Sequence, residues 1–215
     1  MKAKEITNLL LKCNTLKNIE RSGWALEGIT NIASESVAEH SWGTANIALV
    51  LALLEHNQGK SLDISKVLTM AIVHDLPESL ISDIPSKAIV REEEDFLEAK
   101  QDLEKKAFEE IISSFSEKKI RRRLRKAWQE YVICQTQEAK IVRAADILDM
   151  IVQARSFENS GIPPPLLETF FTISQDVLSS LTLDSAMSIF DELLKGHKDL
   201  IRTMKQSESI SNRED

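Results

Sequence analysis

Helical periodicity runs through almost the whole chain and restricts its fold more than any other feature. Apolar residues recur at helical spacing from residue 3 to about residue 205, and no convincing segment alternates as a half-buried strand does. Six glycines, five prolines and one tyrosine are few for 215 residues, whereas Leu, Ile, Ala, Glu and Lys are abundant and favour helices. The sequence therefore predicts an all-α protein, long enough for a substantial core.

The periodic segments also predict where the helices lie. They cover residues 3–19, 37–56, 64–75, 87–115, 117–134, 137–158, 165–181 and 184–205. A loop from Arg21 separates the first two, and the acidic run at 92–95 is expected to be a solvated helix start. The residues expected to face the core are Ile64, Val67, Leu68, Ala71 and Ile72 in the third helix, and Phe96, Leu103, Ala107, Ile111 and Phe115 in the fourth.

The chain shows no internal repeat and no linker that would divide it. We therefore expect one domain over residues 1–205, with its core motifs in 20–160 and C-terminal helices in 165–205. The polar residues 206–215 are expected to form a disordered tail. No role follows from the sequence for the helices after residue 165 beyond covering the core.

The charge of the chain argues against a nucleic-acid polymer as its main partner. Its formal net charge is −7, whereas binding to such a polymer relies on basic surface. One basic run occurs at 118–126, where Ile120 and Leu124 recur at helical spacing. We expect this run to be a solvated helix face; the alternative is a local surface for a phosphate or a partner.

Cysteine usage and hydropathy favour a cytoplasmic protein. Cys13 and Cys134 are isolated, so neither a disulfide framework nor a zinc motif is expected. The N-terminal segment is charged and amphipathic, without the apolar core of a signal peptide. The longest apolar stretch, at 45–54, is far shorter than the ~20 residues that span a bilayer, so no membrane segment is expected.

The stretch VHDLPESLISDIPS, at 73–86, ends an apolar helix with an unusual set of polar residues. Pro77 lacks an amide hydrogen and disfavours helical geometry at the residue before it, so the helix is expected to break there. His74 and Asp75 then lie in its last turn, and Glu78 and Asp83 on the irregular segment beyond.

Two further polar residues are out of place on a packing argument. Ser36 and Glu39 form a capping box, and His40 follows directly, in a first helical turn that faces inward. Asp146 lies on an otherwise apolar helix face, where a carboxylate is costly unless it is paired. The simpler alternatives are a satisfied, partly buried histidine and an ion pair between Asp146 and Arg143.

The remaining polar residues near these positions carry less weight. His56 and His197 lie at polar helix ends and are expected to be structural. Asp149 is near the face of Asp146, but its ridge is less uniformly apolar. The unusual set is therefore His40, His74, Asp75 and Asp146. Two imidazoles and two carboxylates suit a first-row divalent metal, which lowers the pKa of bound water and polarises a phosphoryl oxygen.

Three segments resemble a known family. They are ESVAEHS at 35–41, HDLPESLISDIPS at 74–86 and EYVICQTQEAKIVRAADILDMIVQA at 130–154. Together they resemble the HD-domain superfamily of metal-dependent phosphohydrolases, and most closely its 5′-deoxynucleotidase branch, which includes the HD-domain-containing protein 2 type. The resemblance covers roughly residues 5–160. It implies a single HD-domain helical bundle and a homodimer.

The resemblance also implies roles for the site residues. His40, His74, Asp75 and Asp146 would hold one divalent transition metal ion, namely Mn, Co, Ni, Fe or Zn rather than Mg. Glu78 would orient or deprotonate the attacking water, and Asp83 would assist proton transfer or contact the sugar-phosphate.

Arg21 and Trp24 match an Arg and a Trp that precede the first histidine in the family. Arg21 would bind phosphate, and Trp24 would pack a sugar or base. The interval from Trp24 to His40 is slightly longer than in the family, and Glu27 stands where a basic residue is common. The alternatives are a surface cation for Arg21 and a core aromatic for Trp24.

The predicted function is removal of the 5′-phosphate from nucleoside monophosphates, the deoxy forms above all. One alternative is hydrolysis of another phosphoester, such as a cyclic nucleotide, an alarmone or a nucleoside triphosphate. The chain is short for a regulated triphosphohydrolase. The other alternative is a nucleotide sensor that keeps the metal site without turnover, which would have less need of Glu78 and Asp83.

Overall fold

The computed structural model confirms an all-α chain and describes residues 3–30, 33–85 and 94–211. In these ranges no strand occurs, and the extended backbone is limited to an isolated bridge between Glu20 and Ser36. The elements are α1 (Ala3–Thr15), η1 (Leu16–Asn18), α2 (Ser22–Leu26), α3 (Val37–Asn57), α4 (Ile64–Val73), α5 (Glu78–Ile81), α6 (Glu94–Ser113), α7 (Lys118–Ile133), α8 (Gln137–Asn159), η2 (Pro164–Leu167), α9 (Glu168–Leu181) and α10 (Asp184–Ser211).

The helix bounds agree with the expected ones apart from a few details. The loop after Arg21 contains the short helix α2, which periodicity did not predict. The segment after Pro77, expected to be irregular, contains the short helix α5 with Glu78 in its first turn. The last helix, α10, continues to Ser211 rather than ending near residue 205. The helix expected over 87–115 is described from Glu94 onward, so its expected first turns and half of the acidic run at 92–95 lie outside the described residues, as does the end of the expected tail.

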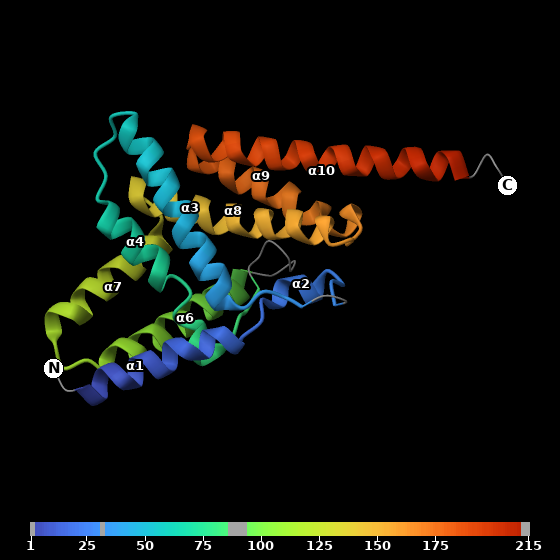
Figure 1. Cartoon of the computed structure of the whole chain (residues 1–215). Helices are drawn as coiled ribbons and strands as arrows, with labels where there is room; N and C mark the ends of the chain where they lie inside the picture. Colours follow the sequence, from blue (N-terminus) through green and yellow to red (C-terminus); the bar gives the residue numbers. More distant parts are fainter. Residues whose placement is uncertain (1–2, 31–32, 86–93, 212–215) are drawn as a thin grey trace.

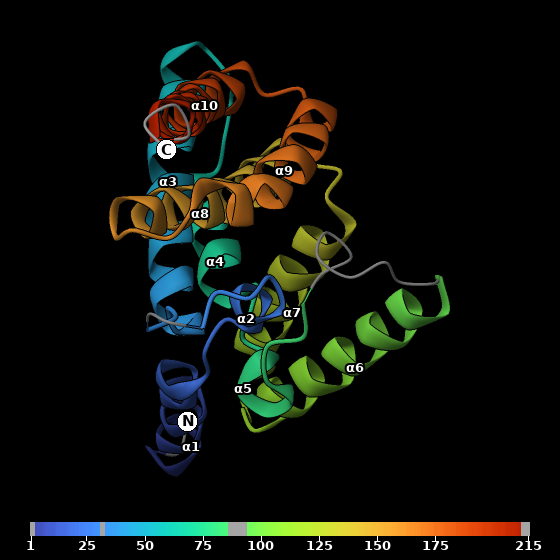
Figure 2. The same cartoon turned by 90° about the vertical axis from the view of Figure 1, so that its right-hand side faces the viewer.

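Helix α8 is the centre of the bundle. It packs against α3, α4, α7, α9 and α10. Figures 1 and 2 place α9 and α10 at one end of the molecule and α1, α5 and α6 at the other, with α3, α4 and α8 between them. The residues of α8 that face this core, such as Ile141, Ala145 and Leu148, are fully buried. The middle of α8 therefore runs through the core of the bundle.

Some of the predictions of buried core residues are wrong. Ile72 is 64% exposed, because α4 meets its neighbours through Val67, Met70 and Ala71, and Ile72 lies on the other side of the helix. In α6, Phe96 and Leu103 are 43% and 42% exposed. The buried residues of α6 gather in its C-terminal half, Ala107, Phe108, Ile111 and Ile112, where Phe108 stacks on Trp128 of α7 at 4.8 Å between ring centroids.

Among the described helices, α3 alone is long and apolar enough to cross a bilayer, by length and composition. The stretch at 45–54 did not predict this, because the helix extends well beyond it on both sides. The finding is weak evidence for a membrane, since core helices meet the same criteria. Helix α3 carries His40 and Glu55 with 0% and 1% of their surfaces exposed, and it packs along α8 and α4.

Candidate metal centre and active-site cavity

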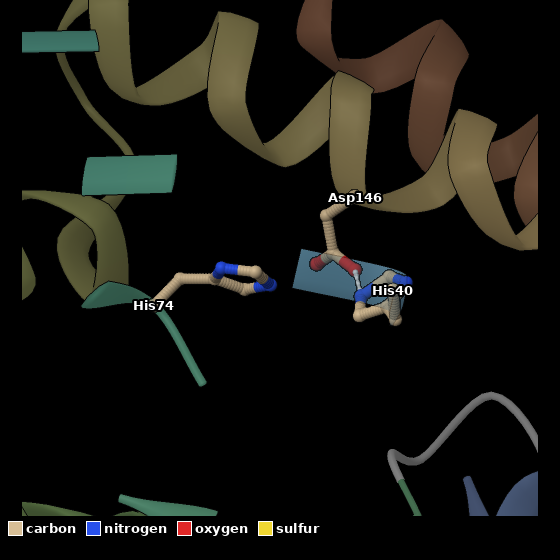
Figure 3. Close-up of side chains that lie close together, drawn as sticks. All are labelled: His40, His74 and Asp146. Atoms are coloured by element: carbon tan, nitrogen blue, oxygen red, sulfur yellow. Dashed lines mark hydrogen bonds and ion pairs between the residues drawn. The ribbon is translucent and has the colours of Figure 1, made fainter. Parts of the chain in front are cut away.

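The structure brings His40, His74, Asp75 and Asp146 together. Figure 3 shows the two imidazoles and the Asp146 carboxylate pointing toward one another from α3, the end of α4 and α8. The ligand atoms of these three residues lie within 4.8 Å of one another. Asp75 completes the group, because its Oδ2 lies 3.1 Å from His74 Nε2 and 3.6 Å from His40 Nε2. Histidines from two different helices thus face a shared pair of carboxylates.

Hydrogen bonds on the far side of each ring leave Nε2 as the ligand atom. His40 Nδ1 donates to Asp149 Oδ2 at 2.8 Å, and His74 Nδ1 donates to the carbonyl of Ala71 at 2.8 Å. A carboxylate and a carbonyl can only accept, so Nδ1 carries the proton in both rings. A second bond of this kind is the usual way in which a ligating imidazole is oriented.

Two atoms of this group fit a cation and little else. His74 Nε2 and Asp75 Oδ2 are buried, and neither finds a hydrogen-bond partner within the described ranges. Both are acceptors, and a buried acceptor without a partner is costly. A divalent ion between them would satisfy both atoms, together with His40 Nε2 and Asp146 Oδ1, which lie 3.2 Å apart. Imidazole nitrogens and carboxylate oxygens suit a first-row transition metal.

The charges of the group also favour a cation. Burial raises the pKa of Asp75, but its interactions with His74 and the charge of Arg21 outweigh this and lower that pKa below its usual range. Burial likewise raises the pKa of Asp146, but its hydrogen bond to His40 and the charge of Arg143 outweigh this and lower the pKa well below its usual range. Both carboxyls are therefore ionised. Burial and the charge of Arg21 lower the pKa of His40, yet hydrogen bonds to Asp146 and Asp149 raise it to about 9, so without a metal ion a second proton at Nε2 offsets part of this negative charge.

Local structure places each ligand. The expected capping box is present, since the Ser36 hydroxyl accepts from the Glu39 amide at 3.2 Å and Glu39 accepts from the Ser36 amide at 2.7 Å. It starts α3 just before His40. Helix α4 ends at Val73, so the predicted break before Pro77 is confirmed, but His74 and Asp75 follow the helix instead of lying in its last turn. The indole of Trp128 donates to the carbonyl of His74 at 3.2 Å and ties this end of α4 to α7.

Asp146 makes the ion pair with Arg143 that was the simpler alternative, and it also faces the cluster. Its Oδ2 accepts from Arg143 at 3.2 Å and from the Tyr131 hydroxyl at 2.7 Å, whereas Oδ1 faces His40. The guanidinium of Arg143 also lies over the Tyr131 ring, 4.4 Å from its centroid. One oxygen is thus held by neighbours, and the other is presented to the cluster.

Sequence reasoning missed the importance of Asp149. This residue is only 9% exposed, and its carboxylate holds the His40 ring. Gly43 makes room for it, since a Cβ at this position would lie 1.9 Å from Asp149 Oδ1. A glycine inside an apolar helix was the available signal, because this residue weakens a helix and often marks a close approach. Glu35 lies near the same pair, and its Oε1 accepts from the Trp24 indole at 3.3 Å.

The two acidic residues after the helix break have different surroundings. Glu78 is 7% exposed, and its Oε2 is buried without a hydrogen-bond partner among the residues described. Burial and the charges of Asp75 and Asp83 raise the pKa of Glu78 well above its usual range. Asp83 is more fully bonded: its Oδ2 accepts from the Ser22 amide at 2.6 Å and the Ser22 hydroxyl at 3.0 Å. Ser82, at φ +63°, makes the left-handed turn that precedes it.

Arg21 is not a surface cation. Its side chain is 19% exposed and lies 3.6 Å from Asp75 and 3.4 Å from Asp83. Trp24 is a core aromatic, 2% exposed and in ring contact with Phe157 and Phe170. It also lines the cavity that contains the cluster, so the packing role and the site role are compatible.

A cavity of about 410 Å³ joins these residues. Its charged part contains His74, Asp75, Glu78, Asp83, Arg21, Arg143 and Asp146. Lys100, Gln101 and Glu104 of α6 contribute further polar side chains, and α8 and α9 contribute mostly apolar ones. A concave site with an apolar wall and a few converging polar groups is typical of a small-molecule site.

Comparisons with known proteins identify the family of this chain. The HD domain family matches residues 13–181. The chain is 37% identical over 149 residues to the 5′-deoxynucleotidase HDDC2 of Dictyostelium discoideum, covering 68% of this chain and 74% of that protein. It is 29% identical over 170 residues to the human 5′-deoxynucleotidase HDDC2, covering 79% and 76%.

Solved structures show the same fold. A Pyrococcus horikoshii protein is 35% identical with a TM-score of 0.70, over 87% of this chain and 97% of that one. An HD-domain phosphohydrolase from Listeria innocua, at 19% identity, shares the fold with a TM-score of 0.73 over 94% and 99%. Because the family match spans most of the sequence and the relatives align over most of their own length, this chain belongs to the HD domain family.

Proposed function

We propose that the protein is a metal-dependent phosphohydrolase that removes the 5′-phosphate from nucleoside monophosphates, the deoxy forms above all. The observation that carries the proposal is the pair of buried, unpartnered acceptors, His74 Nε2 and Asp75 Oδ2, beside a cavity that also contains Glu78 and Arg21. The substrate class is supported by relatives named 5′-deoxynucleotidase in several eukaryotes.

The metal would be held by His40, His74, Asp75 and Asp146. When bound there, a divalent ion polarises a phosphoryl oxygen and lowers the pKa of water. The mixed imidazole and carboxylate set favours Mn, Co, Ni, Fe or Zn over Mg, which prefers oxygen ligands alone.

Glu78 is the proton-transfer group in this proposal. Its free Oε2 takes the proton of the water that attacks phosphorus. As the bond from phosphorus to the 5′ oxygen breaks, the Glu78 carboxyl returns a proton to that oxygen, leaving a nucleoside and inorganic phosphate. A metal ion bound beside Asp75 would offset the negative charges that raise the pKa of Glu78, and it would favour the ionised form of Glu78.

Arg21 would offset the charge on the phosphoryl oxygens, because a guanidinium binds phosphate with two parallel hydrogen bonds. Asp83 holds Arg21 and the amide of Ser22, so we propose that its main role is to position Arg21. The other role considered for Asp83, assistance in proton transfer, is less favoured because its oxygens already accept hydrogen bonds. Trp24 would pack against the sugar or the base.

We also propose a single domain over residues 1–205, a homodimer and a cytoplasmic location. The net charge of −7 supports a small-molecule substrate over a nucleic-acid polymer. Light scattering on the purified protein measures the mass of the assembly, and a monomer at micromolar concentration would contradict the dimer.

Phosphate release from a panel of nucleotides tests the activity. Metal-stripped protein is resupplied with manganese, cobalt, nickel, iron, zinc or magnesium and given ribo- and deoxyribonucleoside monophosphates, cyclic nucleotides and triphosphates. We expect metal-dependent release from deoxymonophosphates that is lost in His74→Ala. No release from any monophosphate, with the metal site occupied, would overturn the proposal in favour of another phosphoester or a sensor.

A further inference from the structure

Helix α9, for which the sequence suggested no role beyond covering the core, forms part of the cavity wall. It contributes Phe170, Ile173, Ser174 and Val177 to the lining. Three of these side chains are apolar, and Ser174 is the exception. The wall continues with Ile147 and Met150 of α8 and with Trp24, whose ring lies 4.5 Å from that of Phe170. The cavity therefore has an apolar part as well as the charged part at the metal cluster.

Ser174 is unusual among the hydroxyls of α9. It is 2% exposed, and its Oγ has no hydrogen-bond partner in the described ranges. On the same helix, Thr172, Ser179 and Ser180 each donate to a carbonyl of α9. Thr44 and Ser79 also carry buried, unpartnered hydroxyls, but neither lines the cavity. Ser174 thus combines a missing partner with a place in the cavity wall.

We propose that the apolar part of the cavity holds the nucleobase, and that Ser174 Oγ makes a hydrogen bond to the edge of the base. This inference rests on the proposed function. A base has two apolar faces, which suit Trp24, Phe170 and Met150, and a polar edge that needs a partner when buried. An unpaired buried hydroxyl in such a wall is satisfied when a base is bound.

The chemistry of a hydroxyl gives the inference a consequence for specificity. A serine hydroxyl rotates and can either donate or accept, so it can bond to the edge of any base. The contact with Ser174 should therefore favour no single base over the others.

The test compares Ser174→Ala with the parent on two kinds of substrate. The four deoxynucleoside monophosphates carry a base, and 2-deoxyribose 5-phosphate has the same sugar and phosphate without one. We expect the ratio of kcat/KM for nucleotide to kcat/KM for the sugar phosphate to fall about 3- to 10-fold, as for one uncharged hydrogen bond. An unchanged ratio would overturn the inference.

Two further variants control for packing. Ser179→Ala removes an exposed hydroxyl of the same helix that bonds to its own backbone, and it should leave the ratio unchanged. Ser174→Thr keeps a hydroxyl and should restore part of the ratio. A fall of similar size in Ser179→Ala would attribute the effect to helix packing and reject the contact.

Binding of nucleosides separates this inference from the proposed function. Deoxynucleosides carry the base but no phosphate, and calorimetry on the metal-loaded protein should show binding that weakens about 3- to 10-fold in Ser174→Ala. If nucleosides bind in this way but no nucleotide is hydrolysed, the proposed activity fails and the base site stands. If nucleotides are hydrolysed but nucleosides bind both proteins equally, the base site fails alone.

Discussion

At the scale of single residues, the orientation of the His40 ring depends on Asp149, which is not one of the proposed metal ligands. Asp149 accepts the Nδ1 proton of His40 at 2.8 Å and so leaves Nε2 facing Asp75 and Asp146. Removing a partner of this kind typically lowers metal affinity by about 10- to 100-fold. The same contact explains why α3 tolerates a glycine at position 43, which the Asp149 side chain approaches closely.

We expect Asp149→Ala to weaken metal binding by about 10- to 100-fold, because the His40 ring loses the bond that orients it. Competition with a chelator of known affinity measures this change. Asp149→Asn keeps an acceptor for Nδ1, so its metal affinity should fall less. Asp176→Asn, at an exposed position of α9, should keep the parent's metal affinity. Equal affinities in Asp149→Ala and the parent would show that His40 does not need this partner.

Gly43→Ala should weaken metal binding although alanine is the better helix former. Its Cβ would meet Asp149 Oδ1 at 1.9 Å, so the carboxylate must move and release His40. The same chelator competition detects the effect. Asn46→Ala, an exposed substitution one turn along α3, serves as the matched control and should keep the parent affinity.

Glu78 and Asp146 should separate turnover from metal binding. Glu78→Ala is expected to keep the fold and the metal but to lose about 10²- to 10⁴-fold in kcat, as for removal of a general acid-base group. Asp146→Ala should lose the metal. Metal content by elemental analysis, beside phosphate release, distinguishes the two. Turnover at the parent rate in Glu78→Ala would reject the mechanism while leaving the metal site in place.

At the scale of elements, a buried ionic cluster joins α8, α9 and α10. His197 is 0% exposed; its Nδ1 bonds to Glu158, and its Nε2 lies 2.9 Å from Glu168 Oε2. The ring stacks on Phe171 at 4.0 Å, and Arg155 pairs with Glu158. The prediction that His197 lies at a polar helix end is wrong, because α10 continues to Ser211 and places the residue in mid-helix.

The stabilisation from His197 should depend on pH. Burial lowers its pKa, but hydrogen bonds to Glu158 and Glu168 outweigh this and raise it. A raised pKa means that the stabilisation is complete below the unfolded value of about 6.5 and is lost as pH rises through the folded value. His197→Gln should therefore lower the free energy of unfolding by about 3 kcal/mol at pH 6 and by less at pH 9.

Urea unfolding of the parent and His197→Gln at several pH values measures this difference. His56→Gln, at an exposed position near the end of α3, should show no such pH-dependent loss. A difference between the parent and His197→Gln that stayed constant from pH 6 to pH 9 would mean that His197 acts through packing alone.

At the scale of the whole molecule, the candidate metal centre joins segments that are far apart in the sequence. Its ligands come from the start of α3, the end of α4 and the middle of α8, and α8 is also the helix that contacts most of the bundle. A ligand that binds only the folded chain stabilises it by mass action, by about 2.7 kcal/mol at 100 times its dissociation constant.

Metal should therefore raise the unfolding temperature of the whole domain. We expect metal-stripped protein to melt several degrees lower than the protein with excess metal, and Asp146→Ala to show no such shift. Calorimetry gives both values. If no transition metal changed the melting temperature of the parent protein, the result would argue against a site built from His40, His74, Asp75 and Asp146.

The sequence by itself determined what depends on neighbours along the chain. The capping box before His40 and the helix break at Pro77 follow from hydrogen bonds and dihedral limits within a few residues. Amphipathic periodicity likewise predicted most helices, and the unusual placement of His40, His74, Asp75 and Asp146 identified the cluster. The family resemblance then supplied the roles of the four.

Only the tertiary structure decided what depends on contacts between distant segments. It showed that Asp149 lies close to Gly43 and forms a hydrogen bond with His40. It also showed that His197 is buried and that Ser174 lines the cavity. It also exposed Ile72 and Phe96, which periodicity had placed in the core. Periodicity gives the apolar face of a helix but not the neighbour that covers it, and burial depends on which helices pack together.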